Sequence, residues 1–537
     1  MAQIAPPADL AHGAFSDTPP WILSTTDLHR LADVEQLRRA EEARIPALLR
    51  PRRLPPGARV ARVVREIGGA VAMWRIREGR SQGSERRAGI SRRLRVAAER
   101  LGPTYIKLGQ IIAAGEGVFP DELVTEFTKC RDQVPAEPFD AVRQVVQGEL
   151  RRPLEDVFLH FEREPVAAAS IAQVHRAWLR AGPDGVPVEV VVKVQRPSVG
   201  RLVHHDLEVM AWLAPFLIGR IPVTALANPP ALVEVFTRTI VEELDFRIEA
   251  ANMVDIARSL AELDQRRFVV PRPHPQLVTR KVLVMERLDG FPFDAVSDQR
   301  AAGVDTHEVV RSHMIGLLEG AMISGIFHGD LHGGNLFVRP DGRTALLDFG
   351  MVGRLSDERR VAFLRLLVAS TTNDVKGHVA AIRDLGALPA DTDLDEVIAE
   401  LGLDRPPIDP TSLSREELVH ELNRVVRALL DFGARMPKEL MLFAKNMVFL
   451  DAAIARLAPD LDLFAEIMSI TTYFARTHGA RIAADVGMRA EDYEIDLTGM
   501  KGSFGVDPSL ESLTYRELRE RRELIRRRLS ARGRKAR

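Results

Sequence analysis

Three side chains that could hold and transfer a phosphoryl group lie close together in this sequence. Asp330 is followed five positions later by Asn335, and Asp348 comes thirteen positions after that, leading into Phe349 and Gly350. Phosphoryl transfer uses one carboxylate to orient the accepting hydroxyl, and an amide and a second carboxylate to hold Mg²⁺. We therefore predict Asp330 as the catalytic carboxylate and Asn335 and Asp348 as the metal ligands.

The spacing of the two segments is similar to that in protein kinases. His328–Asn335 resembles their catalytic loop, and Asp348–Gly350 resembles the metal-binding segment that follows it. Gly329 stands where protein kinases carry an arginine that links this loop to a phosphorylated activation segment, so we do not expect phosphorylation of that kind to be the switch. The alternative is a helix-capping Asp and a turn Asn aligned by chance.

A phosphate clamp is predicted upstream of the catalytic loop. Val190–Val194 is typical of a strand, and Lys193 on it would neutralise the α- and β-phosphates of a nucleotide. Such a lysine needs a carboxylate to fix its position, and Glu249 is the candidate. A lysine near a strand end is more often a solvated surface residue, but the catalytic-loop pattern downstream favours the functional interpretation.

Two further segments are predicted to contact the nucleotide. No glycine-rich loop precedes the lysine strand, and the alanine-rich segment that replaces it could offer backbone N–H groups to phosphate, although alanine resists positive φ. Tight packing is the alternative for this segment. A strand over 282–285 should end in a hinge whose backbone binds adenine. The predicted contacts are Ala167, Ala168, Ala169, Ser170, Met285, Glu286 and Leu288.

The elements that must position these groups follow from the periodicity of apolar residues. Short β-branched runs over 158–161, 173–180, 186–194 and 282–285 predict strands of a small sheet. Helices are expected over 27–44, 91–114 with an interruption at Gly102–Pro103, 202–263, 309–326 and much of the chain to about 485. A small sheet followed by a helical half indicates an α+β fold with two lobes.

Five further motifs make the chain resemble the UbiB/ADCK family of atypical kinases. The family has an alanine-rich loop and the motifs S-I-A-Q-V-H, V-K-V-Q-R-P, K-x-G-Q and E-x-D. In this chain they are Ala167–Ala169, Ser170–His175, Val192–Pro197, Lys107–Gln110 and Glu243–Asp245. The resemblance covers about residues 90–455 and includes each of these signatures.

The resemblance implies a bilobal protein-kinase-like fold with a small antiparallel-sheet N-lobe, a helical C-lobe and an N-terminal helical extension covering the cleft. It also implies ATP (or ADP) and Mg²⁺ as cofactors. Lys107, Gly109 and Gln110 would form an occluding, regulatory motif with Glu243 and Asp245, and Lys107 and Gln110 would lie near the nucleotide. Without the resemblance, Lys107 and Gln110 would be interpreted as a solvated helix face.

Five domains are predicted. They are a variable, partly disordered N-terminus (1–56), a helical extension with the K-x-G-Q motif (57–150), an N-lobe with a helical insert (151–288), a C-lobe (289–485) and a C-terminal extension with a basic tail (486–537).

The function implied by the resemblance is that of an ATP-dependent phosphotransferase or ATPase. Its substrate would be a small lipid-like molecule or quinone precursor, in support of isoprenoid quinone (ubiquinone-like) biosynthesis or lipid homeostasis, with quinone-biosynthesis enzymes as candidate partners. One alternative is a nucleotide-gated, non-catalytic scaffold or lipid chaperone, against which the intact Asp330, Asn335 and Asp348 argue. Another is a small-molecule kinase of the aminoglycoside or choline type, against which Lys107 and the alanine-rich segment argue.

Composition sets limits on location and partners. A single cysteine, Cys130, excludes an internal disulfide framework and fits a reducing compartment. We expect a cytoplasmic protein, since the N-terminus lacks a signal-peptide pattern and no apolar run reaches the 18 or so residues of a spanning helix.

The basic residues gather at two places in a chain of formal net charge −1. Residues 51–100 hold 14 Arg and 4 Glu, and residues 516–537 hold 10 Arg, 1 Lys and 3 Glu. The first region includes an amphipathic basic helix from Val60 to Trp74, which could pack on the protein or lie at the inner face of an anionic membrane. The second is predicted to be a charged helix or a disordered tail. No nucleic-acid partner is expected, because neither region interleaves aromatic residues or carries a base-reading module.

Overall fold

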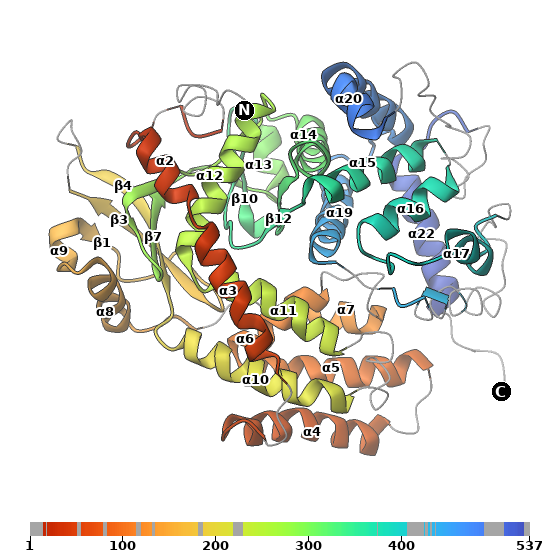
Figure 1. Ribbon diagram of the computed structural model, residues 1–537. Coiled ribbons are helices and arrows are strands. Elements are labelled where there is room, and N and C mark those ends of the chain that lie inside the picture. The colour runs from red at the N-terminus through yellow and green to blue at the C-terminus, as the bar shows by residue number, and fades with distance from the viewer. Residues whose placement is uncertain are drawn as a thin grey trace. The chain divides into compact units, whose positions relative to one another are not determined.

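The computed structural model describes residues 14–17, 19–50, 55–78, 83–113, 120–130, 135–180, 186–217, 229–372, 374–404, 424, 428–429, 432–434, 437–487 and 510–530 (Figure 1). The chain forms two compact units. The first consists of Met1–Pro292, Asp330–Arg339 and Arg343–Val352, and the second of Phe293–Gly329, Pro340–Gly342 and Gly353–Arg537. All the residues predicted above to form the site belong to the first unit.

An antiparallel sheet of six strands is the centre of the first unit. Its order is β1-β3-β4-β7-β6, with β2 paired to β3. The strands are β1 (Phe158–Phe161), β2 (Ala167–Ala168), β3 (Ala172–Leu179), β4 (Val188–Gln195), β6 (Pro273–Val278) and β7 (Val282–Glu286). The strands predicted over 158–161, 173–180, 186–194 and 282–285 are confirmed to within two residues at each end.

Helices lie on both faces of this sheet (Figure 1). On one face, α8 (Phe139–Leu150) contributes Val142 and Val146 to an apolar core that includes Val190, Val192 and Val194 of β4, and α9 (Leu154–Val157) precedes β1. On the other face lies α12 (Phe246–Glu262), which contacts β6 and β7. The alternation of side chains along β4 therefore directs Lys193 away from the apolar core and toward α12.

A smaller sheet lies in the same unit. Its order is β5-β11-β10-β8, with β5 (Phe268–Val269), β8 (Phe291–Pro292), β10 (Leu336–Val338) and β11 (Thr344–Leu346). Strands β10 and β11 pair as an antiparallel hairpin with Leu336 opposite Leu346. This hairpin connects the two predicted metal-binding segments, because Asn335 precedes β10 and Asp348 follows β11. A short turn η3 (Gly333–Asn335) leads into β10.

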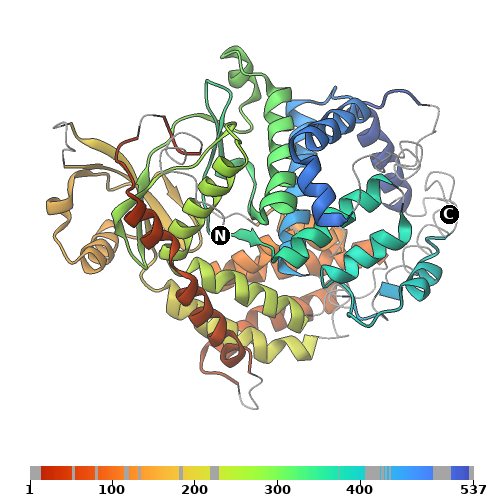
Figure 2. The ribbon, with the colours of Figure 1, turned by 45° about the horizontal axis from the view of Figure 1, so that its top comes forward.

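The remaining helices of the first unit come before the sheet in sequence or form its insert. They are α2 (Thr25–Ala32), α3 (Glu35–Leu48), α4 (Arg59–Glu78), α5 (Gly83–Leu101), α6 (Pro103–Ala113), α7 (Asp121–Phe127), α10 (Val199–Leu217) and α11 (Pro229–Glu243). Helix α4 packs on α5 and α10, and α3 packs on α10 and α11; Figure 2 shows these helices from a second direction. The predicted interruption at Gly102–Pro103 is confirmed, since α5 ends at Leu101 and α6 begins at Pro103.

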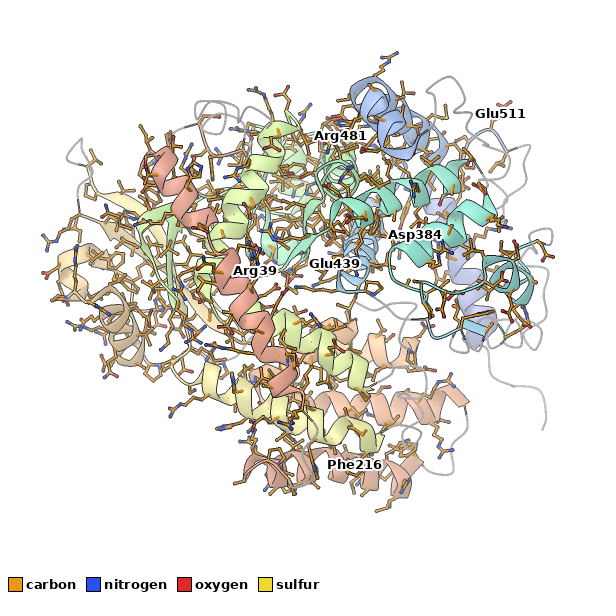
Figure 3. The ribbon with its side chains drawn as sticks, viewed as in Figure 1. Arg39, Phe216, Asp384, Glu439, Arg481 and Glu511 are labelled. Carbon is orange, nitrogen blue, oxygen red and sulfur yellow. The ribbon has the colours of Figure 1, made fainter. Side chains whose placement is uncertain are left out.

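The second unit is mainly helical, as predicted. Its elements are α13 (Val296–Ala301), α14 (Thr306–Leu318), a π-helical turn η2 (Glu319–Ser324), β9 (Ile326–His328), α15 (Asp357–Thr371), α16 (Val375–Asp384), α17 (Leu394–Leu401), α19 (Lys438–Leu457), α20 (Leu463–Val486) and α22 (Tyr515–Ser530). The short strand β12 (Val352–Arg354) begins at the last residue of the first unit. Figure 3 marks Asp384 at the end of α16, Glu439 on α19 and Arg481 on α20.

Buried polar contacts join the helices of the second unit. Glu319 is fully buried in η2 and accepts hydrogen bonds from Tyr473 Oη at 2.7 Å and His478 Nε2 at 2.8 Å. The basic tail begins as the helix α22, and Tyr515 at its start donates a hydrogen bond to the carbonyl oxygen of Asp451 at 2.6 Å. Leu513 and Leu518 pack with Phe464 of α20. The helical alternative for this tail is thus confirmed for residues 515–530, while its last residues, 531–537, lie outside the described part.

Two expectations about local structure were wrong. The helix predicted over 27–44 is two helices, α2 and α3, because the chain leaves the helical conformation at Asp33 and Val34, where Val34 is buried by tertiary packing. The helix predicted over 309–326 begins at Thr306, where Asp305 caps it, and its α-helical part ends at Leu318. In the alanine-rich segment, Ala167 and Ala168 pair with β3.

Within the described residues, no helix has the combination of length and apolar character that crossing a membrane requires. The N-terminal residues on which the signal-peptide expectation depends, 1–13, lie outside the described part.

Candidate active site

Lys193 forms the centre of a buried ionic cluster. Its Nζ donates to Glu249 Oε1 at 2.7 Å and to Asp348 Oδ1 at 3.1 Å. The Lys193 side chain is 12% exposed and that of Glu249 is 5% exposed. Burial alone would favour the neutral amine, but the carboxylates of Asp348 and Glu249 outweigh it and raise the pKa of Lys193. Lys193 of β4 therefore keeps a permanent positive charge beside Glu249 of α12 and Asp348, which follows β11.

Glu249 is placed by the start of α12. Asp245 caps this helix by accepting a hydrogen bond from the backbone N–H of Arg247, and Glu249 follows in the first turn. A carboxylate in the first turn is favoured by the helix dipole. Val194 of β4 is hydrogen-bonded in register with Val282 of β7, so the strand that carries Lys193 is fixed at the centre of the sheet. The predicted pair of Lys193 and Glu249 is thus formed by two rigid elements.

Asp348 has an unusual backbone conformation. Its φ is +56°, in the left-handed region that few residues other than glycine adopt. Its Oδ1 accepts a hydrogen bond from the backbone N–H of Gly350 at 3.1 Å. Burial alone would raise the pKa of the Asp348 carboxyl, but Lys193 and Lys107 lower it well below its usual range. This carboxylate is therefore ionised, while its side chain keeps 44% of its surface exposed.

Asn335 and Asp330 are joined to the Asp348 segment through the backbone. Asn335 Nδ2 donates to the carbonyl oxygen of Asp330 at 3.1 Å, and the backbone N–H of Leu347 donates to the carbonyl oxygen of Asn335 at 2.8 Å. The first bond occupies the NH₂ side of the amide, which leaves its carbonyl oxygen as the atom that can face a cation. Asp330 and Asn335 are 8% and 7% exposed. His332 Nε2 lies 4.0 Å from Asp330 Oδ1.

The residues present fit a magnesium ion. Asn335 and Asp348 offer one amide oxygen and one carboxylate, the hard oxygen ligands that Mg²⁺ prefers, and Mg²⁺ commonly completes its shell with water and phosphate oxygens. The described residues contain no group of three or more His, Cys, Asp or Glu side chains that could hold a metal by themselves. A nucleotide phosphate would therefore have to complete such a site.

The K-x-G-Q helix reaches this cluster through one ion pair. Lys107 Nζ of α6 lies 3.1 Å from Glu243 Oε1 at the end of α11, and the two side chains are 12% and 9% exposed. Burial raises the pKa of Glu243 to about 7, with Asp348 and Asp330 adding to the rise and Lys107 opposing it. Glu243 thus lies within the field of both predicted active-site aspartates.

The other residues of the K-x-G-Q and E-x-D motifs have different surroundings. Gly109 faces the ring of Phe127 on α7, where an added Cβ would come within 2.5 Å of the ring. Gln110 is half-buried on α6. Asp245 is buried beneath Arg247, whose Nη2 donates to its Oδ2 at 2.6 Å. The structure therefore places Lys107 beside Glu243, and Asp245 in a helix cap.

The alanine-rich segment is held against β3 and by an arginine. After the β2 pairing, the backbone N–H of Ala169 donates to the carbonyl oxygen of Ala172 at 2.8 Å, which closes a tight hairpin with Ser170 buried in its turn. Arg196 Nε donates to the carbonyl oxygen of Ala169 at 2.9 Å. The V-K-V-Q-R-P motif thus supports the predicted phosphate-binding hairpin as well as carrying Lys193.

The predicted adenine hinge is tied to the N-terminal segment. Ser16 Oγ donates to Glu286 Oε1, and the backbone N–H of Arg272 donates to Glu286 Oε2 at 3.1 Å. Leu288 packs in a small apolar cluster with Val269 of β5. Met285 is partly buried in β7. The Glu286 and Leu288 side chains are therefore structural here, which leaves the backbone as the part that could contact a base.

Sequence reasoning missed Asn252 and Arg38. Asn252 Nδ2 donates to the carbonyl oxygen of Phe349 at 2.8 Å, and Arg38 Nη2 donates to Asn252 Oδ1 at 2.8 Å. Asn252 could have been suspected, because it lies three positions after Glu249, on the same face of α12. No pattern in the sequence points to Arg38, which lies more than 200 positions away from Asn252.

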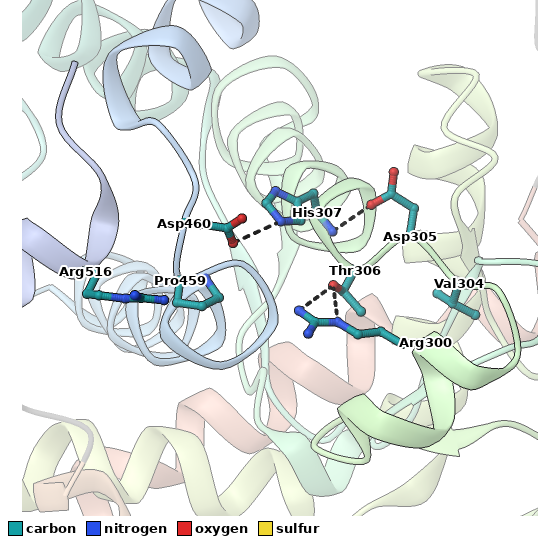
Figure 4. A pocket seen from close by; sticks show the side chains of 8 residues that line it. All are labelled: Arg300, Val304, Asp305, Thr306, His307, Pro459, Asp460 and Arg516. Carbon is teal, nitrogen blue, oxygen red and sulfur yellow. Dashed lines mark hydrogen bonds and ion pairs between the residues drawn. The ribbon is translucent and has the colours of Figure 1, made fainter. Parts of the chain in front are cut away.

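The second unit contains a separate pocket of about 540 Å³ (Figure 4). It is lined by Arg300, Val304, Asp305, Thr306, His307, Pro459, Asp460 and Arg516. His307 Nε2 lies 3.3 Å from Asp460 Oδ1, and Arg300 Nε lies 3.4 Å from Thr306 Oγ1. None of the residues predicted from the sequence lines this pocket, so we give it no part in the phosphoryl chemistry.

Comparison with known proteins gives the family. The model of the ABC1 atypical kinase-like domain matches residues 129–382. An uncharacterized protein of Mycobacterium tuberculosis is 36% identical over 383 residues, covering 70% of this chain and 76% of that protein. An uncharacterized aarF domain-containing protein kinase of Arabidopsis thaliana, described as chloroplastic, is 31% identical over 414 residues, covering 72% of this chain and 75% of that protein.

The chain belongs to the UbiB/ADCK family of atypical kinases. This confirms the predicted family and, with the antiparallel sheet of the first unit and the helices of the second, an α+β fold of the protein-kinase-like class. Among solved structures, the erythromycin complex of a Mycobacterium tuberculosis protein has a TM-score of 0.35 and 23% identity, covering 65% of this chain and 91% of that one. In this UbiB/ADCK member, the family motifs surround the Lys193 cluster.

Proposed function

We propose that this protein binds ATP–Mg²⁺ and either hydrolyses it or transfers its terminal phosphoryl group to a small lipid-like molecule. One observation carries the proposal: Lys193 lies between Glu249 and Asp348, at 2.7 Å and 3.1 Å. A buried lysine shared by a supporting carboxylate and a metal-binding carboxylate is the arrangement that nucleotide phosphates require. A purely structural ion pair between Lys193 and Glu249 would not require Asp348 as a third member in a left-handed backbone conformation.

Each residue of the cluster has a proposed role. Lys193 would bind the α- and β-phosphates, and Glu249 would fix the position of its amine. Asp330 would orient the attacking hydroxyl or water by accepting its hydrogen bond. Asn335 and Asp348 would hold Mg²⁺, which when bound neutralises charge on the phosphate oxygens. ADP would use the same lysine and the same backbone contacts.

The proposed substrate class is a lipid-like molecule, with a quinone precursor as the leading candidate. Family membership supports this, because the family is associated with isoprenoid quinone biosynthesis and lipid homeostasis. The pair of Lys107 and Glu243 brings the K-x-G-Q helix to the cluster from within the first unit. Quinone-biosynthesis enzymes are the proposed protein partners. A scaffold without catalysis remains the alternative if nucleotide binds but is not turned over.

The test is ATP turnover by the purified full chain with Asp348→Asn. The variant should lose Mg²⁺-dependent turnover by at least about 100-fold, because the ligand charge is lost. Asp264→Asn is a matched control, since Asp264 is also an aspartate with positive φ, +50°, and its side chain is 79% exposed. Equal turnover by the two variants would refute the proposed roles.

We also propose that α4 contacts an anionic membrane surface. Val60, Val63 and Trp74 are buried, so the predicted packing of this helix on the protein is one part of its role. Outside that buried face the helix exposes Ile76 (77%) on the opposite side, and Val64 (45%) and Met73 (39%) on its two flanks. Exposed apolar side chains on a helix that already has a buried face point to a second apolar contact.

The charges of α4 support a lipid surface as that contact. Arg75 and Arg77 at the end of the helix are exposed beside Ile76. The two acidic side chains of the helix are turned into ion pairs: Glu66 lies 3.6 Å from an Arg100 nitrogen, and Glu78 lies 2.8 Å from an Arg93 nitrogen. The outward face is therefore apolar and cationic, which suits anionic headgroups. Phe216, 47% exposed and marked at the end of α10 in Figure 3, is a further exposed apolar residue of the same unit.

A further inference from the structure

We propose that Arg38, acting through Asn252, positions the segment Asp348–Gly350, so that the N-terminal segment forms part of the active site. This inference depends on the proposed function for its catalytic consequence. Its structural part concerns residues 14–17 and 19–48 of the first unit, which we call the N-terminal strap. The sequence predicted a variable, partly disordered N-terminus with one helix, over 27–44, for this region.

The C-terminal half of the strap is linked to the Asp348 segment through the buried amide of Asn252. Arg38, on α3, donates from Nη2 to Asn252 Oδ1 at 2.8 Å, and Asn252 Nδ2 donates to the carbonyl oxygen of Phe349 at 2.8 Å. Asn252 is 3% exposed and Phe349 is 1% exposed. The bond to Phe349 therefore forms inside the protein, one residue after Asp348.

Arg38 fixes the orientation of this amide. A guanidinium can only donate hydrogen bonds, so the Asn252 atom that faces Arg38 must be the oxygen. The NH₂ group must then face Phe349, whose carbonyl oxygen can only accept. Without Arg38, the amide oxygen would lose this donor, and the amide would be held less firmly against Phe349.

Arg38 itself is held in place by two acidic residues. Its Nη2 lies 3.7 Å from Asp255 Oδ2, on the same helix as Asn252, and its Nη1 lies 3.9 Å from Glu35 Oε2 on its own helix. The Arg38 side chain is 14% exposed and that of Asp255 is 12% exposed. The guanidinium is thus docked at the surface of α12 by charge as well as by its hydrogen bond.

The first residues of the strap are anchored at the predicted hinge. Phe15 forms a parallel bridge with Val270, whose backbone N–H donates to the carbonyl oxygen of Ala14 at 2.6 Å. Arg272 Nη2 donates to the carbonyl oxygen of Ser16 at 3.0 Å. Between the two anchors, α2 packs along α12, as Figures 1 and 2 both show. The strap therefore contacts the hinge directly, and it reaches the Asp348 segment through Asn252 of α12.

The Asp348 segment has particular need of such support. A left-handed conformation at a residue other than glycine persists only where the surroundings hold it. The bond from Asn252 to Phe349 is one such constraint on the next peptide unit. Its loss should leave the Asp348 carboxylate less well placed, and outer contacts of this kind typically change metal affinity by about 10- to 100-fold.

Arg38→Ala in the full chain tests the proposal, with Arg39→Ala as the matched control. Arg39 is the next residue of α3, its side chain is 74% exposed, and its Nε lies 3.2 Å from Glu35 Oε1 (Figure 3). The Mg²⁺ concentration that half-saturates ATP turnover should rise about tenfold in Arg38→Ala and remain unchanged in Arg39→Ala. Equal Mg²⁺ requirements in the two variants would overturn the proposal.

Hydrogen–deuterium exchange of the peptide containing residues 347–351 is a readout that needs no nucleotide. Arg38→Ala should exchange faster there than Arg39→Ala. If the wild-type protein turns over no ATP, the proposed function fails, but faster exchange would still support the positioning role. Slow exchange in both variants would refute that role even if ATP turnover is normal.

Asn252→Asp distinguishes positioning of Phe349 by Asn252 from simple docking of the strap on α12. The carboxylate would keep, as an ion pair, the contact with Arg38, but it could not donate to Phe349. The strap should therefore stay bound, as measured by slow exchange of α3, while the 347–351 peptide exchanges faster and the Mg²⁺ requirement rises. This variant also serves if Arg38→Ala does not fold. A wild-type Mg²⁺ requirement and wild-type exchange in Asn252→Asp would disprove the proposed positioning of the Asp348 segment through Asn252.

Discussion

Lys107 and Glu243 form a buried ion pair between two helices that are far apart in sequence, with 3.1 Å between Nζ and Oε1. The pair joins the K-x-G-Q helix to the end of α11, close to Asp348: a Cβ added at Gly350 would lie 3.1 Å from Asp348 Oδ1 and 3.4 Å from Glu243 Cγ. Removing one partner of a buried pair leaves a charge without compensation, which is more destabilising than removing both.

The first prediction concerns this pair. At pH 8, where Glu243 with its pKa of about 7 is charged, Lys107→Met should destabilise the protein by about 3 kcal/mol, because Glu243 would lose its counter-charge in a buried site. Adding Glu243→Gln should recover a large part of that loss. Urea unfolding of the two single variants and the double variant gives the coupling energy. Strictly additive effects would show that the two side chains do not interact in solution.

The second prediction concerns the partner of Lys193. Glu249→Gln should lower kcat/KM for ATP by about 30-fold or more, equivalent to about 2 kcal/mol, because the amine would no longer be held by a second charge. Glu262→Gln is the control, since Glu262 ends the same helix and is exposed. Steady-state ATP turnover measures both. A normal kcat/KM in Glu249→Gln would remove Glu249 from the site.

The site was predictable where chemistry depends on local spacing. Asp330, Asn335 and Asp348 belong to short loops next to a hairpin, so their spacing in sequence reflects their spacing in the fold. Lys193 was predictable because strand alternation decides which face a side chain occupies. The structure brings these four residues together with Glu249, which supports their predicted roles without testing them.

The features that the sequence did not predict depend on contacts between segments that are distant in sequence. Arg38 meets Asn252 across more than 200 positions, and its own neighbours form only a weakly amphipathic helix. Likewise, the break at Asp33 and Val34 divides a stretch whose apolar spacing resembles one continuous helix, because Val34 is buried by tertiary packing. Propensity and periodicity contain no information about such partners, and tertiary packing overrides them.

The third prediction concerns acid sensitivity. Burial lowers the pKa of His313 to about 4, and its ring packs against Phe293 with centroids 5.4 Å apart. Because the unfolded chain, with an ordinary pKa of 6.5, binds the proton first, the free energy of unfolding falls as pH drops from 6.5 toward 4. Between pH 7.5 and pH 5 this one residue should account for about 2 kcal/mol.

His313→Phe should remove that share of the pH dependence while keeping a ring against Phe293. Urea unfolding at both pH values measures it. The variant should lose less stability than the wild type on acidification, whatever its stability at neutral pH. An unchanged difference between the two pH values would show that His313 is not buried in its neutral form.

The fourth prediction tests the proposed membrane contact of α4. Ile76→Glu should lower binding to vesicles that contain anionic phospholipid by more than about tenfold, since it replaces an exposed apolar side chain with a like charge to the lipid. Leu159→Glu is the control, because Leu159 is also exposed, at 57%, but lies on β1. Co-sedimentation at two salt concentrations measures both. Equal binding of the two variants would exclude α4, and self-association without lipid binding would assign its outer face to a second copy of the chain.

The fifth prediction separates packing from chemistry in the K-x-G-Q helix. A Cβ at Gly109 would lie 2.5 Å from Phe127 Cδ1, so Gly109→Ala must push α6 away from α7 and should destabilise the protein by about 1–3 kcal/mol. Phe127→Leu removes the ring that the new methyl group would meet, so the double variant should be less destabilised than the sum of the two single changes. Thermal unfolding of all three variants measures this coupling. If Gly109→Ala instead leaves stability unchanged but alters ATP turnover, close helix packing is not the reason for glycine at this position, and its role lies with the nucleotide.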